Sequence, residues 1–258
     1  MCVLLLSFGQ HRQYPLVVAA NRDEFLQRPT RAAAFWQDAP QVLAGRDLSQ
    51  GGTWLGITRD GRFAALTNFR DPPAKRADRP SRGHLVSQFL CGDDTPAAYV
   101  AELAARAQHY NGFSLIVGHG GEFCYYANLE REPRALSPGL YGLSNHLLDT
   151  PWPKVVRGKQ ALAQLMSAGT GPEAESLFTI LADRIPANEA ELPDTGVGQE
   201  RELWLSPLFI TGSDYGTRSS TVLWIDGDGE VTFIERTYNG EPQRYSAVEH
   251  RFRLRDRS

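Results

Sequence analysis

The second residue of the chain is a cysteine, and its place gives it a chemistry that other cysteines lack. The small Cys2 side chain favours removal of Met1, which leaves Cys2 with a free α-amino group whose ordinary pKa is about 7.7–8.0. That amine can act as the base for the Cys2 thiol, without a histidine partner. The thiolate is the nucleophile, and a nearby arginine favours it. By position alone, the more common case is a cysteine that begins a buried strand.

A quartet of polar residues is the second feature that indicates a site. Asn21-Arg22-Asp23-Glu24 directly follows the apolar segment 16–20. If residues 2–8 and 16–21 pair as a hairpin, this quartet lies at the same end as Cys2. An arginine and an aspartate beside a cysteine can hold its thiolate and fix its amine. The alternative is a turn with a local Arg–Asp pair, which is common at strand ends.

The elements that position these residues are mostly hairpins. Apolar segments separated by glycine-bearing turns predict strands at 2–8, 16–21, 53–58, 62–68, 113–118, 122–127, 219–225 and 230–236. Apolar stripes and early prolines predict helices at 83–90, 97–109, 153–167 and 172–183. Residues 70–82 and 186–201 read as polar loops, the first a mobile surface loop. The pattern predicts one α+β domain over residues 1–258, with layers of antiparallel sheet and helix.

Composition excludes several classes of protein. A net charge of −3 and a pI of about 6.1 do not fit a nucleic-acid-binding protein. No apolar run reaches the roughly 20 residues of a transmembrane helix. Three cysteines argue against a disulfide framework and indicate a reducing compartment, so we expect a cytoplasmic protein. The six histidines have no metal-binding spacing, and we expect no metal site.

Several motifs together resemble one known family. The chain is identified as a member of the NRDE family, the group that contains the eukaryotic transport and Golgi organisation protein 2. The resemblance spans almost the whole chain and rests on Met1-Cys2-Val3-Leu4, Asn21-Arg22-Asp23-Glu24-Phe25, Gly51-Gly52-Thr53-Trp54-Leu55-Gly56, Thr67-Asn68-Phe69-Arg70, Leu143-Ser144-Asn145 and Gly216-Thr217-Arg218-Ser219-Ser220-Thr221.

That family is in turn similar to the cysteine N-terminal-nucleophile hydrolases, which include penicillin V acylase and the bile salt hydrolases. The similarity implies an αββα sandwich and cleavage of amide bonds in N-acylated substrates. It implies that Cys2 is the nucleophile and that Arg22 and Asp23 orient the nucleophile and its amine. The spacing differs from the hydrolase pattern, in which the arginine precedes the aspartate by more than one residue.

The same similarity implies that Asn68 and Asn145 build an oxyanion hole and that Arg218 lies near the nucleophile. Acyl transfer needs such donors, because removing one typically costs about 10²–10³ in rate. For each asparagine taken singly, capping of a strand end is the ordinary alternative. For Arg218 the alternative is a solvated loop charge. Together with Cys2, Arg22 and Asp23, these residues predict a catalytic site.

Three further residues are candidates for substrate binding. Asn21 belongs to the polar quartet, and His146 follows Asn145. Gly51-Gly52 reads as a turn that brings Trp54 near a substrate cleft, although burial in the core is the more common fate of a tryptophan. The glycines here do not match a dinucleotide or phosphate-loop fingerprint.

Two functions of different classes remain open. The first is hydrolysis of an amide or thioester through an acyl-enzyme at Cys2, with no required cofactor and an acylated small molecule as substrate. Arg12, Arg22, Arg46 and Arg218 favour an anionic substrate, such as an acyl-coenzyme A (acyl-CoA) or an N-acyl amino acid. The second follows from the eukaryotic relatives, which are associated with haem trafficking and acyl-lipid metabolism: binding of haem or acyl-CoA without turnover. Cys2 or a histidine is then the haem contact. Retention of Met1 favours the second.

Overall fold

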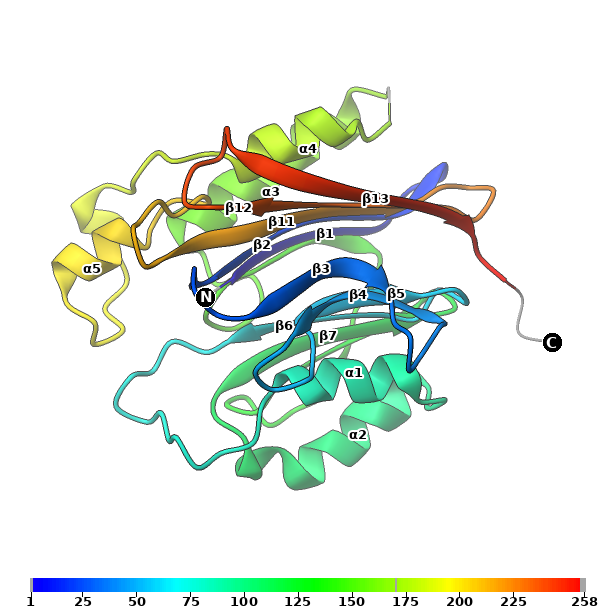
Figure 1. The fold of residues 1–258 in the computed structure, drawn as a ribbon, viewed down its shortest axis with the longest axis horizontal. Helices are drawn as coiled ribbons and strands as arrows, with labels where there is room; N and C mark the ends of the chain where they lie inside the picture. The colour runs from blue at the N-terminus through cyan, green and yellow to red at the C-terminus, as the bar shows by residue number, and fades with distance from the viewer. Residues whose placement is uncertain (1, 170, 256–258) are drawn as a thin grey trace.

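Two antiparallel sheets pack face to face and carry helices on both outer faces (Figure 1). The computed structural model describes residues 2–169 and 171–255. Met1, whose removal the sequence predicts, lies outside the described residues. The order of layers is helix, sheet, sheet, helix, so the predicted α+β class and the αββα sandwich are confirmed.

The six-stranded sheet contains Cys2 and the polar quartet. Its strands, in spatial order, are β10 (Gly139–Leu143), β1 (Cys2–His11), β2 (Tyr14–Phe25), β11 (Tyr215–Ile225), β12 (Glu230–Tyr238) and β13 (Tyr245–Arg253). Successive side chains on a strand point to opposite faces. On β1, Leu4 and Leu6 therefore pack between the two sheets. Val3 and Leu5 pack on the other face, under the helices.

The seven-stranded sheet forms the second layer. Its strands, in spatial order, are β3 (Thr30–Phe35), β4 (Val42–Asp47), β5 (Leu55–Thr58), β6 (Phe63–Asn68), β7 (Phe113–His119), β8 (Glu122–Ala127) and β9 (Arg134–Ala135). Side chains of both sheets, including Leu6 and Phe63, bury each other in one apolar core. This core holds the start of β1 and the C-terminal ends of β2 and β6 close together at one end of the sandwich (Figure 1).

The helices cover the outer faces as separate pairs. On the six-stranded sheet lie α3 (Pro153–Ser167) and α4 (Ala174–Leu181), and on the seven-stranded sheet lie α1 (Gly83–Cys91) and α2 (Pro96–Arg106). A short helix, α5 (Gln199–Trp204), lies beyond the sheet ends, and one-turn 3₁₀ helices span Ala107–His109 and Glu189–Glu191. Pro153 occupies the first turn of α3, where its missing N–H costs nothing.

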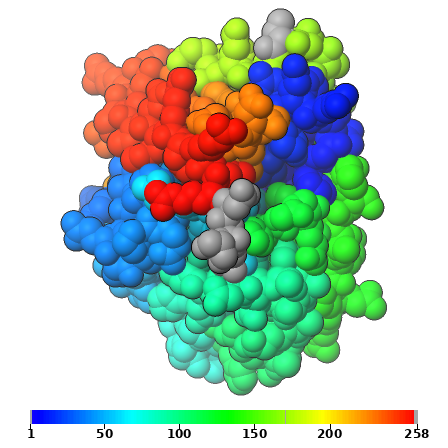
Figure 2. Space-filling view, turned by 90° about the vertical axis from the view of Figure 1, so that its right-hand side faces the viewer, coloured from blue at the N-terminus to red at the C-terminus, as the bar shows by residue number. Residues whose placement is uncertain are grey.

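The C-terminal strand closes the side of the sandwich. After β13 the chain reaches the other sheet, where the N–H of Arg255 donates to the carbonyl of Arg59 at 2.9 Å. Figure 2 shows this C-terminal segment, in red, against the blue segment of the seven-stranded sheet. No helix among the described residues combines the length and the apolar character that a membrane span requires.

Most predicted elements are present, and the differences concern weakly patterned segments. The predicted hairpins correspond to β1–β2, β5–β6, β7–β8 and β11–β12. Strands β3, β4, β9, β10 and β13 were not predicted. The segment 186–201, predicted as a loop, includes a 3₁₀ turn and the start of α5. The helix predicted from residue 172 begins at Ala174, and the one predicted to reach residue 109 ends as an α-helix at Arg106.

Candidate active site

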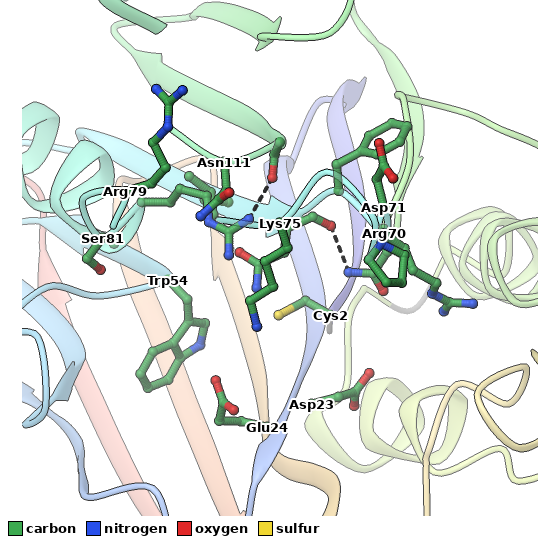
Figure 3. Close-up of a pocket in the computed structure, with 18 of the residues that line it drawn as sticks. Cys2, Asp23, Glu24, Trp54, Arg70, Asp71, Lys75, Arg79, Ser81 and Asn111 are labelled. Carbon is green, nitrogen blue, oxygen red and sulfur yellow. Dashed lines mark hydrogen bonds between the residues drawn. The ribbon is translucent and has the colours of Figure 1, made fainter. Parts of the chain in front are cut away.

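A cavity of about 700 Å³ opens at the end of the sandwich where β1 begins and where β2 and β6 end. Cys2 lies in its wall, and the segment 70–82 and helix α5 border it. The segment 70–82, predicted to be a mobile surface loop, thus forms one side of the cavity. In Figure 3 the sulfur of Cys2 lies between Trp54 on one side and Arg70 on the other. We name this cavity the Cys2 cleft.

Cross-strand pairing positions Cys2 against Arg22. The two residues are direct partners in the β1–β2 ladder, so their side chains share a face of the sheet. The hydroxyl of Ser144 donates to the carbonyl of Cys2 at 3.1 Å and ties the start of β1 to the end of β10. Burial raises the pKa of the Cys2 thiol, whereas the Arg22 charge and the backbone N–H of Asp23 act to lower it.

Arg22 links Cys2 to the aromatic wall of the cleft. Its guanidinium lies over the Trp54 ring, 4.3 Å from the ring centre, and donates to the Thr30 hydroxyl at 3.3 Å. It also lies 3.8 Å from a carboxylate oxygen of Glu24 and of Asp47. These contacts fix a nearly buried cation beside Cys2. Trp54 lines the Cys2 cleft.

Asp23 faces the opposite side of the sheet from Arg22, as alternation requires. It pairs across the strands with Thr217, whose hydroxyl donates to the Asp23 carboxylate at 2.7 Å. Thr217 accepts in turn from the N–H of Ile210 at 2.8 Å. Burial raises the pKa of Asp23, and the charge of Lys154 is the strongest influence that lowers it. Asp23 also borders the cleft, so its carboxylate is buried at the boundary between the cleft and the layer under the helices.

The two predicted oxyanion residues lie together beside Cys2. Asn68 ends β6 and Asn145 follows β10, and both line the Cys2 cleft. The side-chain nitrogen of Asn145 donates to the Asn68 carbonyl at 2.8 Å. This bond uses one of the two N–H groups of the Asn145 side chain, which is buried. The N–H of Arg70 donates to the Asn145 carbonyl at 2.8 Å and fixes the loop that carries it.

Three predicted site residues do not line the cleft. Asn21 is buried under the helices, where its amide donates to the carbonyls of Leu181 and Leu208 at 2.8 and 2.9 Å. Alternation gives Asn21 the opposite face from Arg22, so its position fits a structural role and not substrate binding. His146 packs between Phe69 and Trp152 and pairs with the Thr150 hydroxyl at 2.8 Å.

Arg218, the third of these residues, lies at the bulge between β11 and β2, next to the charges of Arg22 and Glu24. Burial lowers the pKa of Arg218, and the like charge of Arg22 adds to this effect. Arg218 is thus close to Arg22, although it is not part of the cleft wall. Arg12 lies at the far end of β1, and Arg46 pairs on the surface with Asp38 at 2.5 Å, so neither serves the cleft.

The sequence did not indicate several basic residues of the site. Arg82 lines the cleft, and burial lowers its pKa to about 10 while the charges of Cys2 and Glu24 act to raise it. Arg70 forms a buried ion pair with Glu202 at 2.5 Å. Eight basic and four acidic residues line the cleft: Arg22, Arg28, Arg70, Lys75, Arg76, Arg79, Arg82 and Arg201, with Asp23, Glu24, Asp47 and Asp71. The wall is therefore predominantly positive.

Two solved structures of similar fold are variants of one hydrolase. A mutant of the conjugated bile acid hydrolase from Clostridium perfringens is similar with a TM-score of 0.53 over 96% of this chain and 92% of that chain, at 9% identity. A second variant of the same hydrolase gives a TM-score of 0.53 over 98% of both chains. At this identity the similarity concerns the fold, which is that of the N-terminal-nucleophile hydrolases.

Sequence comparison identifies the family. The family profile described as Transport and Golgi organisation 2 matches residues 1–240. The Bos taurus Transport and Golgi organization protein 2 homolog is 41% identical over 98% of this chain and 99% of its own length. The Homo sapiens homolog is 37% identical over 92% of this chain and 93% of its own length. The predicted NRDE-type family is thereby confirmed, and the chain belongs to the Transport and Golgi organisation 2 family.

Proposed function

We propose that this protein is a cysteine N-terminal-nucleophile hydrolase that cleaves an amide or thioester bond in an acylated small molecule. One observation carries the proposal: Cys2 lies in the wall of the cleft beside Arg22, with Asn68 and Asn145 next to it. Nucleophile, cation and amide donors are the parts that acyl transfer needs. The same fold in the bile acid hydrolase supports the proposal.

The reaction proceeds through an acyl-enzyme. After removal of Met1, the α-amino group of Cys2 takes the thiol proton, and Sγ attacks the carbonyl carbon of the substrate. Asn68 and Asn145 donate hydrogen bonds to the oxyanion that forms. The C–N or C–S bond then breaks, and the leaving amine or thiol takes the proton from the α-amino group. Water hydrolyses the remaining thioester and releases the carboxylic acid and free Cys2.

The walls of the cleft favour a substrate with an acyl chain and an anionic group. The excess of basic over acidic lining residues attracts anions. Phe25, Leu129 and Trp204 also line the cleft, and each is at least 36% exposed, which provides apolar surface for an acyl group. An acyl-CoA or an N-acyl amino acid has both parts.

A second candidate function is binding of such a ligand without turnover. The observation in its favour is that burial raises the pKa of the Cys2 thiol, which disfavours the thiolate at neutral pH. Haem is the other ligand of this candidate. No histidine is among the described residues that line the cleft, so Cys2 is the group that would bind the haem iron there.

Intact-protein mass spectrometry distinguishes the two functions. The unmodified protein, Cys2→Ala and Cys91→Ala are incubated with a panel of acyl-CoAs and N-acyl amides. Cys91 is exposed and forms no disulfide, so Cys91→Ala is the matched control for a cysteine outside the cleft. We expect a chain without Met1 that gains the mass of the acyl group in the unmodified protein and in Cys91→Ala, but not in Cys2→Ala.

Three results contradict hydrolysis: retention of Met1, absence of any acyl adduct, or an adduct that persists in Cys2→Ala. Calorimetric titration with acyl-CoA then tests the binding function. Equal affinity in the unmodified protein and in Cys2→Ala, without an adduct, supports binding alone. A haem spectrum that changes on Cys2→Ala assigns the ligand as haem.

A further inference from the structure

Lys154 is a buried lysine to which the proposed reaction assigns no role. It lies in the first turn of α3, is 2% exposed, and its Nζ has no hydrogen-bond partner among the described residues. An isolated buried ammonium is costly, and the positive end of a helix dipole adds to that cost. A lysine in this place therefore requires an anion nearby.

The sheet geometry identifies Asp23 as that anion. Helix α3 lies on the outer face of the six-stranded sheet, and Gly158 lets it approach Leu5 of β1, because a Cβ there would lie 2.9 Å from the leucine methyl groups. Asp23 points to this same face, opposite to Cys2 and Arg22. Lys154 and Asp23 thus occupy the same buried layer between the sheet and α3.

The surrounding charges leave Lys154 as the main cation for Asp23. Burial lowers the pKa of Lys154 to about 8, while Asp23 is the strongest charge that raises it, and Arg70 and Arg157 oppose this. Arg70 already pairs with Glu202 at 2.5 Å. Conversely, Lys154 is the strongest influence that opposes the effect of burial on the pKa of Asp23. The two groups therefore titrate as a coupled pair.

We propose that Lys154 is a positioning residue for the nucleophile, whose buried ammonium keeps the Asp23 carboxylate charged beneath Cys2. The inference rests on the proposed function in one respect: the α-amino group of Cys2 becomes an ammonium when it takes the thiol proton. A charged Asp23 stabilises that ammonium, and a protonated Asp23 does not. Lys154 itself does not touch the substrate, because it is not part of the cleft wall.

The coupling can be measured without any substrate. The chain contains three lysines, so protein labelled with [ε-¹³C]lysine gives three signals, assigned with Lys75→Met and Lys159→Met. We expect the Lys154 signal of the unmodified protein to titrate near pH 8. In Asp23→Asn its proton affinity falls about tenfold or more, a shift of about one pKa unit. Asp149→Asn is the control, because Asp149 pairs with Lys159 at 2.6 Å and not with Lys154, so the Lys154 signal should not move in this variant.

A Lys154 signal that titrates at the ordinary lysine pKa of 10.5, or that does not move in Asp23→Asn, overturns the inference. A second measurement uses the acyl adduct at Cys2. The rate of adduct formation is measured as a function of pH. In Lys154→Met the acid limb of this profile should move to higher pH, and in Lys154→Arg it should return towards the profile of the unmodified protein. In Lys159→Met it should not move. Identical profiles in all four proteins also overturn the inference. If no adduct forms at all, the proposed hydrolysis fails, but the lysine titration needs no substrate and still tests the coupling of Lys154 to Asp23. The two failures can therefore be distinguished.

Discussion

A buried glutamate between the two sheets gives the sharpest test of the structure. Glu235 lies on β12, is 2% exposed, and accepts a hydrogen bond from the N–H of Ala33 on β3 of the other sheet at 2.8 Å. Burial raises the pKa of Glu235 from 4.5 to about 7, although the Ala33 bond and the charge of Arg22 act to lower it. Glu235→Gln keeps the shape and the acceptor oxygen but removes the titration.

The sign of the effect follows from the two pKa values. The folded state binds the proton more tightly than the unfolded state, so Glu235 stabilises the fold fully below about pH 4.5 and loses this contribution as the pH rises through 7. The difference of about 2.5 pKa units corresponds to about 3 kcal/mol, of which about 2.5 kcal/mol is lost between pH 5 and pH 8. As the pH rises from 5 to 8, the free energy of unfolding of Glu235→Gln should therefore increase by about 2.5 kcal/mol relative to that of the unmodified protein.

Guanidinium chloride unfolding, followed by tryptophan fluorescence at pH 5 and pH 8, measures the free energy of unfolding of each variant. Glu230→Gln is the matched control, because Glu230 begins the same strand and is exposed. We expect the difference between the variant and the unmodified protein to change with pH for Glu235→Gln and to stay constant for Glu230→Gln. If both variants follow the unmodified protein in parallel, Glu235 is charged in the fold at pH 5 and the reasoning is refuted.

Three further predictions concern the cleft and its support. Arg82→Gln should slow alkylation of Cys2 by iodoacetamide at pH 7.5, by about threefold to tenfold, because it removes a cation that favours the thiolate; peptide mass spectrometry measures the rate. Asn68→Ala should slow formation of the acyl adduct by about 10²–10³ through loss of an oxyanion donor, with an unchanged melting temperature. Asn21→Leu should lower the free energy of unfolding by about 2–4 kcal/mol, because two buried carbonyls lose their donor. An Asn21→Leu protein of full stability that binds ligand poorly would contradict the structural role of this residue.

The parts of the fold that the sequence predicted are those with strong local signals. The β5–β6 hairpin has short apolar segments on both sides of an Asp60-Gly61 turn, in which Gly61 has a φ of +85° that favours glycine. Strand β13 has no such signal, because every residue in it is at least partly exposed and pairing with β12 alone defines it. The short β10 holds two glycines, and its place beside β1 depends on contacts far apart in sequence.

The same division applies to the site. Cys2, Asn68 and Asn145 could be predicted because each lies at a strand end within a recognisable motif. Arg82 and Lys154 could not, because an arginine in a polar segment and a lysine in a first helical turn are ordinarily solvated. The half-burial of Arg82 and the burial of Lys154 result from the packing of the segment 70–82 and of α3 against strands distant in the chain.

The polar quartet after β2 shows how one short segment serves two sides of a sheet. Alternation directs Arg22 and Glu24 towards the cleft, where Arg22 meets Cys2 and Trp54. It directs Asn21 and Asp23 towards the helices, where Asn21 ties β2 to the carbonyls of Leu181 and Leu208. Asp23 is the member that joins both sides, since its N–H acts on the Cys2 thiol while its carboxylate lies in the layer of Lys154. A one-residue shift of register would exchange the two faces and separate Arg22 from Cys2, so the spacing of the quartet depends on the pleat of β2.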